Sequence, residues 1–311
     1  MKKLKLILVI LICNFSFVIW NSSLFAKGAG SSSGITLLQP VSAKAVGLAE
    51  ACSAISGEVL TLHYNPSGLA TLKGQEISLM YQRGLDEDSF ASILYSKQFP
   101  FATLGASVLY YNTGKVELYD LSWEKISKVG QRDIIITVGA AREISKFSLG
   151  LNFKVISSQI FGERAAAFAM DFGSQYKGLI KNFNIGLSLQ NFGTKLEYLS
   201  KGESLPLTIR FGTRYKKNFT NHAFLCSIDF PYYINDEEIL FLFGVEYTYK
   251  KLLSFRGGYR LNLMNLRDSS REDEPINCGI GITWKNYSLD YAIGITKNLD
   301  LPHRLSIGAK F

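Results

Sequence analysis

Side chains suited to catalysis or metal binding are few in this sequence and lie far apart. The three histidines, His63, His222 and His303, have no neighbour at the spacing of a metal site. The run Gly30-Ser31-Ser32-Ser33-Gly34 places serines between glycines, but it lies in the leader and not at a strand-to-helix turn. We therefore predict no catalytic residue, no metal and no cofactor, and a protein that is not an enzyme.

A second group of candidates consists of charged side chains set between apolar neighbours. Because successive side chains of a β-strand point to opposite faces, this spacing predicts charges on one face and apolar groups on the other. Such charges could bind or conduct a solute, or form a structural hydrogen-bonded network. The candidates are Asp171, Arg210, Arg214, Glu246, Arg256, Arg260, Asp290 and Arg304.

The strands that would carry these charges are predicted from residue 74 to residue 311. Apolar residues recur there at every second position in runs of about 9 to 13 residues, close to the length with which a tilted strand crosses a bilayer. The clearest run contains Phe147, Leu149, Leu151, Phe153 and Val155. We count fourteen runs and predict an all-β fold, a transmembrane antiparallel β-barrel of about 14 strands whose charged faces line the lumen.

The connections between the runs alternate between short and long. Phe99-Pro100-Phe101 and Lys285-Asn286 are short, whereas residues 112–131, 192–204 and 264–274 form long polar connections. Outer-membrane barrels have this asymmetry, with short periplasmic turns and long external loops, and their tyrosines gather near strand ends as they do here. The last strand has one apolar face and ends on Phe311, and we expect it to pair with the first strand near residues 77–81 and so close the barrel.

The first 26 residues have the features of an export signal. Three lysines precede an apolar run from Leu6 to Trp20, and small residues lead to Ala26, where we predict cleavage. An uncleaved anchor is the alternative, although the run is short for a membrane helix. Cys13 lacks the small preceding residues of a lipoprotein site. These features predict a protein of the bacterial cell outer membrane.

Charge and cysteine content exclude further classes. The chain has 311 residues and a net charge of +8, which falls to +5 without residues 1–26, because they hold three lysines and no acid. This excess is too small to indicate nucleic-acid binding. Cys52, Cys226 and Cys278 are odd in number and unpaired in spacing, which argues against a disulfide framework.

Residues 27–73 differ from the barrel and are predicted to form an N-terminal hatch, or plug, with a short helix. Apolar residues between Val41 and Ile55 follow a helical spacing. The segment then closes with the turn Asn65-Pro66-Ser67-Gly68. Glycines on the inward faces of the later strands leave room for this plug in the lumen.

Several stretches resemble the PorV/PorQ group of outer-membrane proteins, which are relatives of the FadL fatty-acid transporter family. They are Ala43-Lys44-Ala45-Val46-Gly47-Leu48-Ala49-Glu50-Ala51, Asn65-Pro66-Ser67-Gly68-Leu69-Ala70, Asp171-Phe172-Gly173, Leu187-Ser188-Leu189-Gln190-Asn191-Phe192-Gly193, Phe255-Arg256-Gly257-Gly258-Tyr259, Leu289-Asp290-Tyr291-Ala292 and His303-Arg304-Leu305-Ser306. The resemblance implies a fourteen-stranded barrel with an N-terminal hatch. The chain is shorter than typical FadL transporters, which argues against an elaborate external ligand-binding region.

Three functions remain open at this point. The resemblance favours a PorV-like component of type IX-like protein secretion that binds secretion subunits or cargo proteins. The alternatives are a FadL-like passive channel for hydrophobic small molecules and a structural barrel without transport. All three imply outer-membrane lipid and the outer-membrane assembly machinery as partners, and we expect Phe311 to act as the C-terminal assembly signal.

Overall fold

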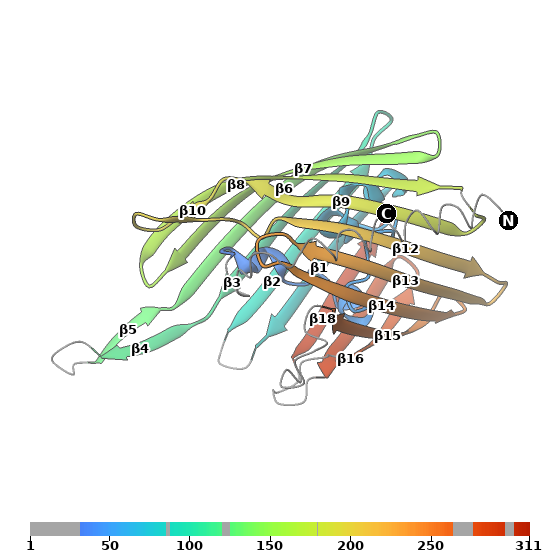
Figure 1. Cartoon of the computed structure of the whole chain (residues 1–311). Coiled ribbons are helices and arrows are strands. Elements are labelled where there is room, and N and C mark those ends of the chain that lie inside the picture. Colours follow the sequence, from blue (N-terminus) through green and yellow to red (C-terminus); the bar gives the residue numbers. More distant parts are fainter. Residues whose placement is uncertain (1–31, 85–87, 120–124, 179, 264–275, 296–301) are drawn as a thin grey trace.

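The barrel predicted from the alternating pattern is present. The computed structural model describes residues 32–84, 88–119, 125–178, 180–263, 276–295 and 302–311, and it contains a closed antiparallel barrel of fourteen strands (Figure 1). The barrel strands are β1 (Gln75–Arg83), β2 (Ser89–Gln98), β3 (Thr103–Asn112), β6 (Gln131–Ile144), β7 (Phe147–Ile160), β8 (Glu163–Lys177), β9 (Phe183–Gly193), β12 (Thr208–Asn218), β13 (His222–Tyr233), β14 (Glu238–Tyr249), β15 (Leu253–Asn262), β16 (Ile276–Trp284), β17 (Tyr287–Ile295) and β18 (His303–Lys310).

The last strand closes the barrel against the first, as predicted. Leu305 of β18 pairs with Tyr81 of β1, and Ala309 pairs with Ile77. The terminal Phe311 exchanges two backbone hydrogen bonds of 2.8 Å with Gln75. Closure pairs both edge strands, so the barrel has no free edge in its sheet.

The two faces of the wall differ in polarity. On β7, Leu149 and Leu151 are exposed outward, whereas Asn152 and Lys154 are buried. The same alternation recurs along the other strands and leaves a belt of exposed large apolar side chains around the barrel. Soluble proteins rarely expose so continuous an apolar surface, and lipid hydrocarbon satisfies it. No helix among the described residues is long and apolar enough to cross a membrane.

The two rims of the barrel differ in the length of their connections. One rim has short turns only. At the other rim β4 (Lys115–Tyr119) and β5 (Lys125–Val129) form a hairpin that extends beyond the wall, and β10 (Leu196–Glu197) pairs with β11 (Gly202–Glu203) (Figure 1). Not every connection at this rim is long: Phe161-Gly162, two residues with positive φ, joins β7 and β8 directly, and residues 234–237 join β13 and β14. The predicted long connection 264–274 lies outside the described residues.

A segment before the barrel, residues 32–73, lies inside it; we call it the lumen segment. It contains η1 (Ile35–Leu38), α2 (Ala43–Gly47), α3 (Thr61–Tyr64) and η2 (Pro66–Thr71), shown in blue in Figure 1. It begins at the long-loop rim, where the Ser33 amide donates to the Ser204 carbonyl. It ends at the short-turn rim, where the Gln98 amide donates to the Gly74 carbonyl.

Two local expectations differ from the structure. The helix expected between Val41 and Ile55 is only the five-residue α2, because Ala49 and Glu50 adopt positive φ and turn the chain. Leu205, Leu207 and Ile209 are apolar at alternate positions and so predict a strand that includes Leu205. In the structure β12 begins at Thr208, and Leu205 is buried beside Leu196 of the β10 hairpin. Both differences arise because the segment and a loop fold back against the lumen.

Candidate functional site

The lumen segment follows the inner wall around the barrel, and glycines allow its backbone to approach. A Cβ on Gly186 of β9 would lie 2.1 Å from the Ser53 carbonyl oxygen, and one on Gly150 of β7 would lie 2.4 Å from the Pro66 carbonyl carbon. Real side chains cannot occupy such positions, so glycine is required there. The inward glycines therefore make room for the lumen segment.

The turn Asn65-Pro66-Ser67-Gly68 attaches the segment to the β7–β9 wall. The Asn65 side-chain amide donates to the Ser174 carbonyl of β8 at 3.2 Å, and its Oδ1 accepts from the Ser67 hydroxyl at 2.6 Å. Pro66 begins η2, where its missing N–H costs no hydrogen bond. A Cβ on Gly68 would meet the Ile55 carbonyl oxygen at 2.6 Å, so the turn fits only with glycine there.

Asp171 is the centre of a buried network on this same wall. Its carboxylate accepts from Lys154 Nζ at 2.8 Å, from the Asn152 amide at 2.9 Å and from the Asn191 backbone N–H at 2.8 Å. Asn152 also donates to the Leu62 carbonyl of the lumen segment at 2.7 Å. Both charges of this network are buried and paired, so it fixes the wall to the segment and is not available to a solute.

Arg210 and Asp229 form a second buried pair, on β12 and β13. Their side chains are 3.3 Å apart, and Asp229 also accepts from the Ser53 backbone N–H at 2.8 Å. Arg210 donates to the Glu50 carbonyl at 2.7 Å and lies over the Tyr64 ring. This pair too binds the lumen segment.

The opposite wall carries a more hydrated chain of charges. Arg256 of β15 contacts Glu246 and Asp290, each at 2.6 Å, and Lys44 of α2 contacts Glu58 at 2.8 Å and Glu246 at 3.7 Å. The side chains of Lys44, Glu58 and Asp290 retain 14–16% exposure. The Lys44–Glu246 contact joins α2 to its wall, and its lysine side chain is partly exposed.

The contacts within this cluster favour the ionised forms of the Lys44 and Glu58 side chains. Burial alone would lower the pKa of Lys44, but the carboxylates of Glu246 and Glu58 raise it above its usual value. Burial would raise the pKa of Glu58, but Lys44, together with Lys310 and Lys216, lowers it well below its usual value. The Lys44–Glu58 pair is thus charged at neutral pH.

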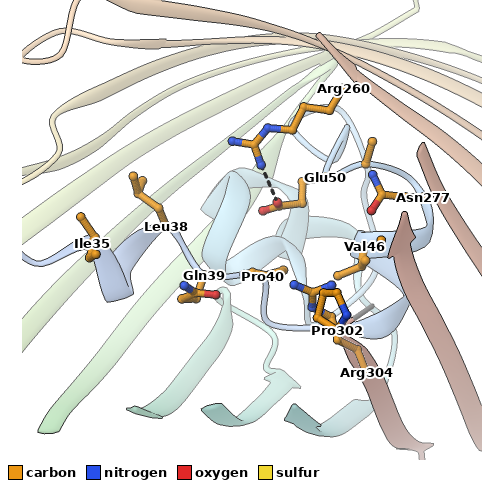
Figure 2. Close-up of a pocket in the computed structure, with 12 residues that line it drawn as sticks. Ile35, Leu38, Gln39, Pro40, Val46, Glu50, Arg260, Asn277, Pro302 and Arg304 are labelled. Carbon is orange, nitrogen blue, oxygen red and sulfur yellow. Dashed lines mark ion pairs between the residues drawn. The ribbon is translucent and has the colours of Figure 1, made fainter. Parts of the chain in front are cut away.

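A cavity of about 360 Å³, the loop-side cavity, lies between the lumen segment and β15–β18 near the long-loop rim. Its wall mixes apolar groups with two arginines. Figure 2 shows the Arg260 guanidinium pointing toward the Glu50 carboxylate, 3.6 Å away. Arg304 Nε donates to Gln82 Oε1 at 2.6 Å. The lining residues are Ile35, Leu38, Gln39, Pro40, Val46, Ala49, Glu50, Arg260, Asn277, Gly294, Pro302 and Arg304.

A second cavity of about 390 Å³, the turn-side cavity, lies on the other side of α2. The two cavities lie along the same strands. On β15, Arg260 lines the loop-side cavity and Arg256 lines the turn-side cavity. On β17, Gly294 lines the loop-side cavity and Asp290 lines the turn-side cavity. Four residues of strand span about 13 Å. Val46 of α2 faces the first cavity and Lys44 the second, so α2 separates two spaces that are in line.

The structure thus divides the eight charged candidates into groups. Asp171 and Arg210 belong to buried networks; Glu246, Arg256 and Asp290 meet around α2; Arg260 and Arg304 line the loop-side cavity. Arg214 faces inward on β12 and forms no ion pair with a described residue. The partners on the lumen segment, Lys44, Glu50 and Glu58, were not predicted, since nothing in their spacing indicates a site.

His63 belongs to α3 of the lumen segment. Burial lowers its pKa well below the usual value, and Lys154 and Arg210 lower it further, so the ring is neutral. Among the described residues no group of three histidine, cysteine or acidic side chains could hold a metal ion.

Comparison with known proteins supports the fold. No family model matches the chain, and no curated protein matches it in sequence. Solved structures do: the P. putida toluene transporter TodX has a TM-score of 0.58 at 12% identity, with 92% of this chain and 99% of that chain covered. A P. aeruginosa FadL homologue has a TM-score of 0.56 at 10% identity, covering 87% and 98%. The chain therefore has the fold of these proteins, none of which is named as an enzyme.

The TodX deltaS2 variant, described as a monoaromatic hydrocarbon channel, has a TM-score of 0.60 at 12% identity. The match covers 85% of this chain and 98% of that one. The similarity extends over nearly the full length of each of these neighbours.

Proposed function

We propose that this protein is a passive outer-membrane channel for small hydrophobic molecules, with the lumen segment as its plug. The observation that carries the proposal is the pair of cavities in line on either side of α2. The neighbours of known structure, a toluene transporter and a FadL homologue, support it. Secretion through PorV-like binding of partner proteins rests only on the sequence motifs, and a barrel without transport leaves the two cavities without a role.

The loop-side cavity suits a molecule with an apolar body and a polar or anionic end. Ile35, Leu38 and Val46 would contact the body. Arg260 and Arg304 would contact the end, and only one of them has a carboxylate partner in the cavity wall, Glu50. A volume of about 360 Å³ is within the range of small-molecule sites.

Passage would require displacement of α2 from its wall. The Ala43 amide donates to the Ser306 hydroxyl at 2.7 Å, and Ala43 and Val46 pack against Ala292. The side chains in these contacts are small, and the Lys44–Glu246 ion pair to the wall is long at 3.7 Å, whereas the remainder of the plug is held by buried networks. Solute moving from one cavity to the other would therefore displace α2 and leave the rest of the lumen segment in place.

The test compares uptake of toluene, octanol and decanoate by cells that carry the wild type or Val46→Trp. A tryptophan at position 46 fills the loop-side cavity, and we expect uptake to fall about tenfold, the level of a cell lacking the gene. Val245→Trp, on the lipid-facing side of β14, is the matched control and should retain uptake. Unchanged uptake of all three solutes on deletion of the gene would reject the channel. Recovery of secretion subunits or exported cargo with the tagged protein would instead favour the secretion function.

A further inference from the structure

The short-turn rim of the barrel carries a ring of lysines. Each of its six hairpin turns has an exposed lysine at or beside it, and we call this set the basic rim: Lys97, Lys146, Lys181, Lys217, Lys250 and Lys285. Because the six hairpins follow one another around the barrel, the positive charges are spread over the whole circumference and do not form a single patch.

Acidic residues do not neutralise this ring. By sequence, residues 99–102, 145–146, 178–182, 219–221, 250–252 and 285–286, which form the six turns, contain no Asp or Glu. Glu143 is close to the β6–β7 turn, but it pairs with Lys177 at 2.9 Å. The opposite rim is different, because the connections after β1 and β13 contain the acidic runs Asp86-Glu87-Asp88 and Asp236-Glu237.

Aromatic rings place the basic rim at the edge of the apolar belt. Lys97 lies over Phe99, with Nζ 5.5 Å from the ring centroid, and Lys217 lies over Phe219 at 4.9 Å. Lys250 over Tyr249 and Lys285 over Trp284 repeat the arrangement at two further turns, at 5.4 and 5.1 Å. Aromatic side chains beside lysines are typical of the headgroup level, where the ring meets acyl chains and the ammonium meets phosphate.

We infer that the basic rim binds the anionic phospholipid headgroups of the leaflet that surrounds the short turns. A folded acidic protein would contact one arc of the rim, whereas a leaflet contacts all six turns at once, which matches the even distribution. Lysines at a membrane surface attract anionic lipid, and the attraction weakens within a Debye length as salt is added. The inference concerns anchoring in the membrane and is independent of transport.

The experiment measures which lipids remain bound to the full-length protein. The protein is purified from mixed micelles that contain equal amounts of phosphatidylglycerol and phosphatidylcholine, and retained lipid is counted by native mass spectrometry. We expect the wild type to retain at least fivefold more phosphatidylglycerol than phosphatidylcholine. The rim variant Lys97→Gln/Lys217→Gln/Lys285→Gln should lower that ratio to below twofold.

The matched control removes three exposed lysines from the long-loop rim, Lys115→Gln/Lys195→Gln/Lys201→Gln, and should keep the wild-type ratio. Equal loss in the two triple variants would show an effect of net charge alone and overturn the inference, as would a wild-type ratio near one. If the rim variant fails to fold, the wild type in 500 mM salt replaces it. A ratio that salt leaves unchanged would then overturn the inference.

Discussion

Two walls of the barrel hold the same plug in different ways. Glycines bring the backbone of the lumen segment close to both walls: a Cβ on Gly150 of β7 would lie 2.4 Å from the Pro66 carbonyl carbon, and one on Gly258 of β15 would lie 2.4 Å from the Ala49 backbone nitrogen. The β6–β9 wall differs in its polar contacts, because the charge of Asp171 there is fully buried and bonded. At the β14–β18 wall the five-residue α2 contacts the barrel through the 3.7 Å Lys44–Glu246 ion pair, and a cavity lies on each side of α2. Because the Asp171 network is buried whereas the Lys44–Glu246 contact is long and partly exposed, we expect the first wall to anchor the lumen segment and the second to release it more readily.

The largest expected difference concerns charge removal on the two walls. Asp171→Ala leaves Lys154 buried without a carboxylate and should lower the free energy of unfolding by about 3–5 kcal/mol. Asp290→Ala should cost clearly less, because Asp290 is partly hydrated and Arg256 keeps Glu246. Denaturant unfolding in micelles measures both values, and equal losses would remove the proposed distinction between the walls.

A smaller effect is expected from added volume at the anchoring wall. Gly150→Ala places a methyl group 2.4 Å from the Pro66 carbonyl carbon and should destabilise the docked segment by about 1–3 kcal/mol. Limited proteolysis of the lumen segment should then be faster than in the wild type. Gly257→Ala is the control, because its new methyl group would meet only the Val245 side chain, at 3.6 Å. Similar cleavage rates in both variants would argue against backbone contact as the anchor.

The smallest effect is the pH dependence of α2. Glu58 has a lowered pKa, so its stabilising contribution is complete above its usual pKa of 4.5 and is lost as the pH falls through its lower folded value. Lys44 has a raised pKa, so its contribution is complete below 10.5 and is lost only at higher pH. Acidification below the usual pKa of Glu58 should therefore reduce the protection of the Ala43 amide, measured by hydrogen exchange, by about tenfold or more.

Glu58→Gln should abolish this acid dependence, because the amide does not titrate. Amides of η2 on the anchoring wall should keep their protection over the same acid range. A loss of protection that is as large in η2 as at Ala43 would mean that acid loosens the whole plug and not α2 alone.

Much of the barrel could be predicted from the sequence because its signals are local. The period-two run of β7 shows a single strand without reference to any other part of the chain, and fourteen such runs give the strand number. The same alternation assigns Asp171, Arg256 and Arg304 to the inner face, since a side chain's face depends only on its neighbours along the strand.

Only the tertiary structure shows which of those inner charges hold the lumen segment and which line a cavity. Asp229 accepts from Ser53, 176 residues away, and Arg260 meets Glu50 of the lumen segment. The sequence determined the barrel and its polarity, because each depends on residues that are adjacent along the chain. Which charges anchor the plug, which line a cavity and where α2 separates two cavities depend on the path of the plug around the wall. That path is set by packing between distant segments, for which one sequence carries no local pattern.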